Sequence, residues 1–229
     1  MGLKNFPQRV AFLFLAFPIF LIGALYAEDL SSSNLIPGGD PHHEIIVSVK
    51  DQRLLLKTDG RNEAIYPVST SKFGIGDRFG SFATPLGKFF IRVKIGMGQP
   101  LGAVFHSRKP TGEVIRPDAP GRDPIVTRIL WLEGVEPGNR NAFNRGIYIH
   151  GTPQEKSLGH PASFGCIRMR STDVAALCDR VGRGALVRII PEHLPVHESL
   201  FSAFGFLNSH NLATSHSGMP ESSGQQEAE

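Results

Sequence analysis

The chain of 229 residues has only two cysteines and a single tryptophan. Its histidines, among them His42, His43, His106 and His160, lack partners of ligand type at the spacing that a metal site needs. No glycine-rich loop leads into the Gly-Lys-Ser/Thr signature that binds phosphates. The arginines are scattered without interleaved aromatic residues, which argues against nucleic acid. The sequence therefore predicts no metal, no cofactor and no nucleic-acid partner.

Glycine and proline are plentiful, at 25 and 17 residues, which favours a turn-rich, strand-rich protein over a helical bundle. One helix should begin near Ser171, a plausible N-cap, and end before Gly182. The expected strands cover residues 45–49, 53–57, 64–70, 88–95, 103–105, 124–132, 145–150 and 185–190. We therefore expect a mostly β domain with one main helix.

The two ends of the chain differ in composition from its middle. Lys4 and Arg9 precede an apolar run over residues 10–27, which predicts either a cleaved signal peptide or a retained membrane anchor. Both alternatives export the rest of the chain. We expect four parts, which are a signal peptide or anchor (1–27), a linker (28–42), a catalytic domain (43–191) and a flexible tail (192–229).

Net charge is +3, and the tail holds glutamates but no lysine or arginine. The middle of the chain is consequently more cationic than the whole. A mildly cationic exported domain suits an anionic wall polymer or a membrane surface. Ordinary solubility is the alternative explanation, and charge alone does not decide between them.

Three reactive side chains stand close together late in the sequence: His150, Cys166 and Arg168. They offer a base, a nucleophile and a fixed positive charge, which acyl transfer through a thioester needs. Imidazole titrates near neutrality, so His150 can take the thiol proton and return it to a leaving amine. A nearby imidazole or guanidinium would raise the thiolate fraction of Cys166. The alternatives are a buried structural cysteine, a structural histidine and a surface salt bridge.

Small and polar residues flank these three groups. Gly165 allows a sharp turn, and backbone N–H groups in such a turn can hold a developing oxyanion. The carbonyl of Gly151 could hold the second nitrogen of the His150 ring. Ser163 and Thr152 are candidate hydrogen-bond donors in the same pocket.

The second cysteine, Cys178, lies on the apolar stripe of the expected helix, together with Val174, Leu177 and Val181. Cysteine in such a place is usually a small buried apolar side chain. A disulfide with Cys166 is the alternative in an exported protein, but it would consume the candidate nucleophile. We therefore favour two free thiols.

At these residues the chain resembles the YkuD-type L,D-transpeptidases of bacterial cell walls, whose signature is His, a gap, and Ser-x-Gly-Cys-x-Arg. Here it is His150-Gly151-Thr152, followed by Ser163-Phe164-Gly165-Cys166-Ile167-Arg168. Upstream, Val68-Ser69-Thr70 and Thr84-Pro85-Leu86-Gly87-Lys88-Phe89 resemble the family's "VST … TPxGxF" strand pair. The likeness covers about residues 44–190 and implies a β-sandwich or barrel.

The resemblance implies that Cys166 is the acyl-forming nucleophile and His150 the base. Arg168 and the backbone of Gly165 and Cys166 would line the oxyanion and substrate pocket. The donor would be a peptidoglycan tetrapeptide stem that loses D-alanine. The acceptor would be an amine of another stem or a lysine of an envelope protein. Carbapenems would inhibit the enzyme, which would work in the periplasm or cell envelope and meet the membrane only through its N-terminal segment.

Phe164 departs from the family, which often has His at this place. It carries no proton and donates no hydrogen bond. It could wall the pocket and exclude water, or it could mark a weakened enzyme. Three hypotheses follow: a cross-linking transpeptidase, an L,D-carboxypeptidase or hydrolase on the same scaffold, and a catalytically weak wall-binding protein. The intact base and nucleophile rank catalysis above binding.

Overall fold

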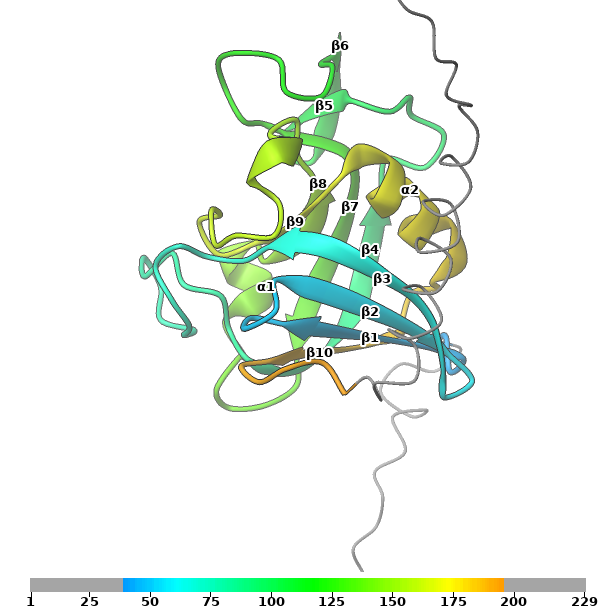
Figure 1. Ribbon diagram of the computed structural model, residues 1–229, viewed down its shortest axis with the longest axis vertical. Helices are drawn as coiled ribbons and strands as arrows, with labels where there is room; N and C mark the ends of the chain where they lie inside the picture. Colours follow the sequence, from blue (N-terminus) through cyan, green and yellow to red (C-terminus); the bar gives the residue numbers. More distant parts are fainter. Residues whose placement is uncertain (1–38, 196–229) are drawn as a thin grey trace, which may run out of the picture. The chain divides into compact units, whose positions relative to one another are not determined.

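The computed structural model describes residues 39–195 (Figure 1). The strands in chain order are β1 (His43–Ser48), β2 (Arg53–Thr58), β3 (Arg61–Ser69), β4 (Gly87–Ile95), β5 (Ala103–His106), β6 (Lys109–Val114), β7 (Ile125–Gly134), β8 (Tyr148–Gly151), β9 (Ile167–Met169) and β10 (Leu186–Ile190). The helical elements are α1 (Ala142–Arg145), the 3-10 turn η2 (Glu155–Ser157) and α2 (Ser171–Arg180). The expected fold class, mostly β with one main helix, is confirmed.

Eight of the strands close into a barrel. They are hydrogen-bonded in the order β4-β10-β1-β2-β3-β9-β8-β7, and β4 also pairs with β7, which joins the two ends of the sheet. Closure removes the free edges that an open sheet of this length would expose. The β5–β6 hairpin lies outside the ring, bonded to β7 through β5, and stands at the top of Figure 1.

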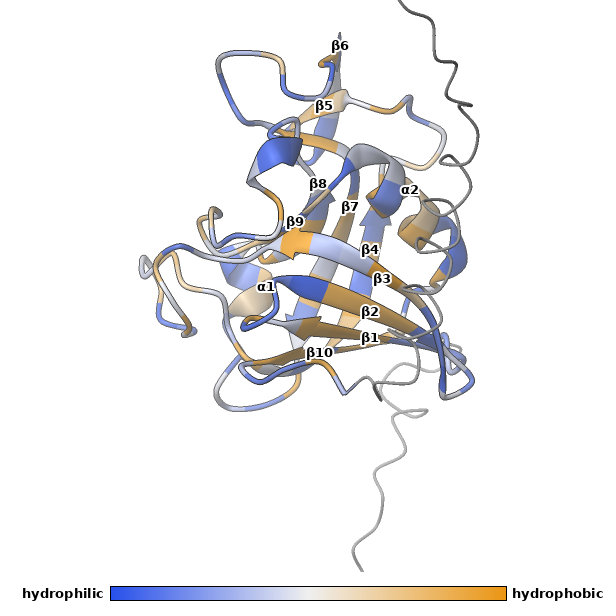
Figure 2. Ribbon diagram, viewed as in Figure 1, coloured by the Kyte–Doolittle hydropathy of each residue, from blue (hydrophilic) through white to orange (hydrophobic). Residues whose placement is uncertain are grey.

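The barrel interior is filled by apolar side chains from alternate strand positions. In β1, Ile45 and Val47 point into this core, whereas Ile46 points outward and packs with Leu55 and Leu194. Both faces of β1 are therefore covered, which explains the continuous apolar run in its sequence. Figure 2 shows the hydrophobic colouring of β1 and β2. Burying each large side chain contributes about 1.5–3 kcal/mol.

Helix α2 turns its apolar stripe toward the same core, with Val174, Leu177 and Cys178 buried. Cys178 is fully buried, and both cysteines of the chain are free thiols. The helix therefore uses Cys178 as a core residue, as expected from its place on the stripe.

The expected N-cap at Ser171 is wrong, because the N-cap residue is Arg170. Ser171 is the first helical residue and is nearly buried. Its hydroxyl accepts a hydrogen bond from Thr127 (2.8 Å), and its N–H donates to the Glu155 carboxylate (2.9 Å). A carboxylate from η2 thus satisfies an N-terminal donor that a cap would otherwise bind.

The expected strand over residues 145–150 is also wrong at its start. Arg145 ends α1, and Gly146 caps that helix in the left-handed conformation (φ +69°). Strand β8 begins only at Tyr148. The sequence analysis missed α1, β6 and β9, of which α1 has only four residues and β9 only three.

Residues that flank the expected domain on either side are hydrogen-bonded to it. Asp40, in the expected linker, accepts a hydrogen bond from the Gly182 N–H (2.5 Å), and the Leu194 N–H donates to Asp51 (2.7 Å). The expected leader and most of the expected tail lie outside the described residues. Within residues 39–195, no helix combines the length and apolar character needed to cross a membrane.

The buried Gln52 side chain ties the β1–β2 turn to the end of β3. Its amide nitrogen donates to the Val49 carbonyl and the Thr70 hydroxyl (2.7 Å each), and its oxygen accepts the Thr70 N–H (2.8 Å). Gln52→Met keeps the volume but leaves that N–H unpaired, so it should cost about 1–3 kcal/mol in urea unfolding. The half-buried Gln154, changed to Met, is the control and should shift stability by about 0.5 kcal/mol or less. Equal effects of the two changes would contradict this role.

Candidate active site

Strands β8 and β9 lie side by side and parallel, with Ile149 opposite Ile167 and His150 opposite Arg168. Ile149 and Ile167 are fully buried in the barrel core. Because side chains alternate along a strand, His150 and Arg168 share the outer face. Cys166 directly precedes Ile167 and packs on that outer side. The structure thus brings the predicted base, nucleophile and guanidinium onto one face of one strand pair.

Cys166 packs against a small apolar cluster on this outer face. Its members include Phe105 of β5, Ile129 of β7 and Tyr148 of β8, and Trp131 of β7 packs on them. Strand β5 contributes Ala103 and Phe105 to this cluster. Cys166, the candidate nucleophile, is therefore partly buried by side chains of β5, β7 and β8.

His150 is held by its own neighbour. Its Nδ1 lies 2.8 Å from the Gly151 carbonyl oxygen, as the sequence analysis expected. A carbonyl only accepts, so Nδ1 carries the proton and Nε2 of the neutral ring is left as the acceptor. The backbone of β8 packs closely here, since a Cβ on Gly151 would lie 2.6 Å from the Val126 carbonyl oxygen. Glycine is therefore required beside the imidazole.

The imidazole is a weak base in this setting. The pKa of His150 is lowered to about 4, chiefly by burial and also by the nearby charge of Arg168, although the Gly151 bond and Asp123 oppose the shift. Only 6% of the residue is exposed. The ring is therefore neutral at physiological pH, as a general base must be.

The thiol of Cys166 donates to the Gly146 carbonyl at 3.3 Å. Burial raises the pKa of Cys166 to about 11, although the Tyr148 backbone N–H, Arg168 and Arg145 favour the thiolate. The sequence analysis expected neighbouring positive charge to raise the thiolate fraction. The guanidinium groups do act in that direction, but desolvation outweighs them, so the resting sulfur is a neutral thiol.

The turn before Cys166 is fixed by buried hydroxyl groups. The Ser163 hydroxyl donates to the Cys166 carbonyl (2.6 Å) and accepts the Gly165 N–H (3.2 Å), and the Thr84 hydroxyl donates to the Gly165 carbonyl (3.0 Å). Gly165 has φ +119°, which only glycine adopts readily. Ser163 therefore holds the backbone of the turn, and the Gly165 N–H expected at an oxyanion is already bonded to it.

Arg168 is engaged by a residue that the sequence analysis missed. Its guanidinium lies 2.7 Å from Asp123, and the side chains are 10% and 15% exposed. The Thr152 hydroxyl donates to the other oxygen of Asp123 (2.6 Å). Asp123 comes from the irregular segment before β7, so no local pattern pointed to it. Arg168 and Thr152 form one buried charged cluster beside His150.

Phe164 lies at the rim, 54% exposed, and contacts the rings of Phe73 (5.4 Å) and Phe82 (5.9 Å). The Lys72 ammonium stands 4.5 Å from the Phe164 ring centre, within range of a cation–π interaction. This loop after β3 is placed by a hydrogen bond from the Lys72 N–H to the Ser163 carbonyl (3.1 Å). The proposed role of Phe164 as a pocket wall stays a prediction.

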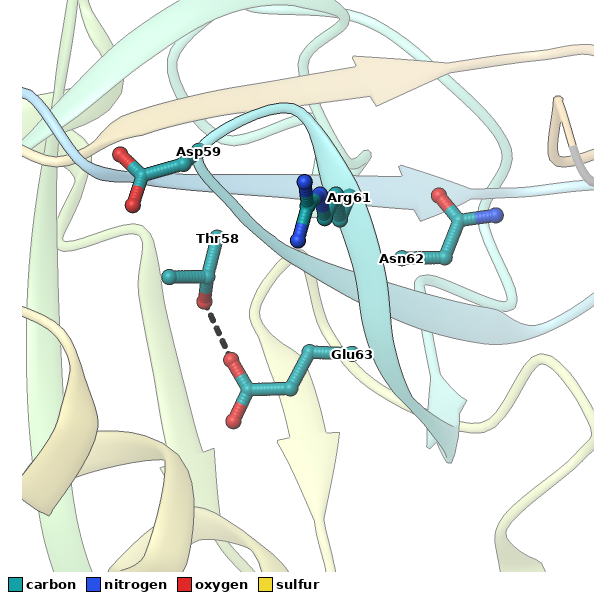
Figure 3. A pocket seen from close by; sticks show the side chains of 5 residues that line it. All are labelled: Thr58, Asp59, Arg61, Asn62 and Glu63. Atoms are coloured by element: carbon teal, nitrogen blue, oxygen red, sulfur yellow. Dashed lines mark hydrogen bonds between the residues drawn. The ribbon is translucent and has the colours of Figure 1, made fainter.

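Other features of the described residues offer no competing site. No cluster of three His, Cys, Asp or Glu side chains within residues 39–195 could hold a metal ion. A surface hollow at the β2–β3 hairpin is lined by Thr58, Asp59, Arg61, Asn62 and Glu63 (Figure 3). Its lining has no thiol or imidazole, and Thr58 hydrogen-bonds Glu63 within it.

Comparison with known proteins gives a consistent family. Residues 42–189 match the model of the L,D-transpeptidase catalytic domain, YkuD. A Bacillus subtilis (strain 168) protein with the provisional name L,D-transpeptidase YqjB is 30% identical over 165 residues, which cover 72% of this chain and 79% of that protein.

Solved structures give a more distant likeness. An L,D-transpeptidase from Mycobacterium smegmatis has a TM-score of 0.42 and 18% identity, covering 65% of this chain and 58% of that one. The L,D-transpeptidase LdtMt1, solved in complex with imipenem, has a TM-score of 0.42 and 19% identity, covering 65% and 59%. This chain therefore matches less than two thirds of the length of these two solved chains.

The raised pKa of Cys166 predicts an unusual alkylation profile. Because only the thiolate reacts, the rate with iodoacetamide should rise about tenfold per pH unit from about pH 6 to about pH 10 without levelling. An ordinary thiol levels above about pH 8.5–9. Mass spectrometry of the peptide that contains Cys166 measures the rate. A plateau already at about pH 6–8 would indicate a thiolate–imidazolium pair and contradict the neutral resting state.

Asp123 should stabilise the fold as the partner of a nearly buried cation. Asp123→Asn leaves Arg168 without a counter-charge and should cost about 3–5 kcal/mol in urea unfolding. Glu113→Gln is the matched control, because Glu113 pairs with Arg122 at an exposed site, where such pairs contribute about 0–1 kcal/mol. A loss for Asp123→Asn no larger than the control's would show that the ion pair does not hold this cluster.

Proposed function

The chain belongs to the YkuD family of L,D-transpeptidase catalytic domains, and on that premise we propose that it is an exported cysteine acyltransferase acting on peptidoglycan stem peptides. The donor is a tetrapeptide stem, cleaved at the carbonyl carbon of its third residue. The acyl group passes to Cys166 and then to an amine. The observation that carries this proposal is the shared outer face of Cys166 and His150, with the Nδ1 of His150 fixed on the Gly151 carbonyl.

The first step forms the thioester. Sγ of Cys166 attacks the carbonyl carbon while its proton moves to Nε2 of His150. Because both groups are neutral at rest, transfer ahead of attack is uphill, so the proton leaves as the C–S bond forms. The C–N bond then breaks, and the imidazolium returns the proton to the D-alanine nitrogen. This leaves the acyl group on sulfur and His150 neutral.

The protein stabilises the negative charge of the tetrahedral intermediate electrostatically. Arg168 and Arg145 both act on the sulfur from nearby, as their effect on its pKa indicates. Each is ion-paired, Arg168 with Asp123 and Arg145 with Asp77, so each contributes as one end of a fixed dipole rather than as a free cation. Such a preorganised field costs no reorganisation during reaction.

The second step is the reverse of the first with a new nucleophile. Neutral His150 removes a proton from the acceptor amine as it attacks the thioester carbonyl, and the thiol of Cys166 is restored. The acceptor is the side-chain amine of a diamino acid in another stem or a lysine of an envelope protein. Water as acceptor would make the enzyme an L,D-carboxypeptidase or hydrolase. The exposed rings of Phe73, Phe82 and Phe164 favour an amine, because they put an apolar rim near the thioester.

Export follows from the same proposal, since peptidoglycan lies outside the cytoplasm. Residues 1–27 would serve as a cleaved signal or a membrane anchor, and the domain would work in the periplasm or cell envelope. Detection of the protein in the cytoplasm alone, after fractionation of the native host, would contradict this assignment.

The function is tested by mass spectrometry of the protein with muropeptides and with a carbapenem. Wild type should gain one acyl group on Cys166, release D-alanine and yield cross-linked dimer, and Cys166→Ser should lose nearly all three. Cys178→Ala is the matched control, because Cys178 lies in the core, and it should keep the adduct. D-alanine release without dimer would indicate the hydrolase, and an unmodified Cys166 would refute acyl transfer.

A further inference from the structure

Two of the arginines around the nucleophile are already neutralised. Arg168 pairs with Asp123 at 2.7 Å, and Arg145 pairs with Asp77 at 3.0 Å with both side chains under a tenth exposed. A substrate carboxylate could reach either only by displacing a buried partner. Arg168, which was expected to line the oxyanion and substrate pocket, is therefore poorly placed to bind a substrate carboxylate.

A third arginine differs in each of these respects. Arg108 is exposed at the tip of the β5–β6 hairpin. Its guanidinium donates to the Tyr148 hydroxyl (3.2 Å) and lies 4.6 Å from the ring centre of Trp131. Within residues 39–195, no carboxylate lies within 4.0 Å of it. Neither of its contacts carries a negative charge, so its positive charge is uncompensated.

The backbone under Arg108 is in an unfavourable conformation. Ser107 and Arg108 are the two central residues of the turn that joins His106 to Lys109, and both have positive φ (+47° and +67°). Such two-residue turns favour Asn-Gly or Gly-Gly, since other residues are strained there. The turn therefore holds two non-glycine residues in a conformation that costs free energy. The side chain of Arg108 folds back onto the outer face instead of extending into solvent.

Tyr148 connects this guanidinium to the nucleophile. Its backbone N–H is near enough to the sulfur of Cys166 to lower the pKa of the thiol, and its ring hydroxyl accepts the bond from Arg108. Trp131 is itself rigid, stacked on Phe143 at 4.0 Å between ring centres. The side chains of Trp131 and Tyr148 therefore hold the Arg108 guanidinium on the same face as the Cys166 sulfur. The guanidinium and the sulfur are separated by about the length of the tyrosine side chain.

From this geometry we propose that Arg108 binds a carboxylate of the acyl donor and so sets the specificity of the enzyme for carboxylate-bearing peptides. The inference rests on the proposed function and adds a substrate-binding residue to it. The planar guanidinium can offer two parallel N–H groups to a carboxylate while its face stays on Trp131. The carboxylate belongs either to the departing residue or to another residue of the donor.

Peptide donors with amidated carboxylates test the proposal, using the full chain. Arg108→Gln should lower kcat/KM for the carboxylate donor at least about tenfold, mostly through KM, because the lost contact binds substrate. With a donor in which every carboxylate is a carboxamide, wild type and Arg108→Gln should be equal. Singly amidated donors then identify which carboxylate is bound, namely the one whose removal abolishes the effect of the variant.

Three further variants exclude trivial explanations. Lys109→Gln removes an equal charge from the next residue of the hairpin, which is also exposed, and should change kcat/KM less than about twofold. Arg108→Lys should recover only part of the loss, because ammonium lacks the two-pronged geometry. Arg108→Gly suits the positive φ of the turn, so it should keep the melting temperature while losing the carboxylate preference. If Arg108→Gly lost both its activity and its folded structure, the assignment would be overturned.

The proposal fails if Arg108→Gln affects carboxylate and carboxamide donors equally, or if Lys109→Gln matches it. Donor binding to Cys166→Ser, measured by calorimetry with and without Arg108→Gln, separates this failure from failure of the proposed function. A carboxylate preference that depends on Arg108 supports the site even if no thioester forms. Absence of that preference overturns the site even if wild type acylates.

Discussion

The site depends on the register of the parallel β8–β9 pair. Ile149 and Ile167 stand opposite each other in the barrel core and are completely buried, which pins the register by hydrophobic burial. A slip of one residue would turn His150, the proposed base, into the core. Barrel closure reinforces this, because β8 and β9 are held by β7 and β3 on their other edges. Packing of two isoleucines thus determines on which face His150 and Arg168 lie.

Burial on the outer face has a second consequence, which is electrostatic. The Cys166 thiol packs on this cluster and the His150 imidazole is buried beside Arg168, and desolvation favours the neutral form of each. The positive charges of Arg168 and Arg145 are neutralised as well, because each guanidinium forms an ion pair with a carboxylate. At the solvent edge, the guanidinium of Arg108 on the β5–β6 hairpin has no carboxylate of residues 39–195 within 4.0 Å. This arrangement agrees with the proposed mechanism, in which the proton leaves the sulfur only as the C–S bond forms.

Much of the fold and the motif residues could be predicted, because they leave local patterns. Short apolar runs next to turn residues located β1, β2 and β4, the apolar stripe located α2, and the contact of His150 with Gly151 follows from adjacent residues. The four-residue α1 and the three-residue β9 are too short to show a period, and both are stabilised by neighbours distant in sequence.

The other omissions share a cause. Asp123 reaches Arg168 from a segment 45 residues away with no regular structure, and Arg108 reaches Tyr148 across a hairpin. The protonation of Cys166 could not be deduced from its neighbours in sequence, because burial by Phe105, Ile129 and Tyr148 decides it. Tertiary contacts, not residue types, determine these features.

The charge state of the resting pair is measured most directly by nitrogen-15 NMR of the His150 ring near neutral pH, assigned with His150→Ala. The account predicts a neutral imidazole with Nδ1 protonated and Nε2 bare, beside a protonated Cys166. An imidazolium with both nitrogens protonated, which reverts to neutral in Cys166→Ser, would show an ion pair at rest and contradict the account.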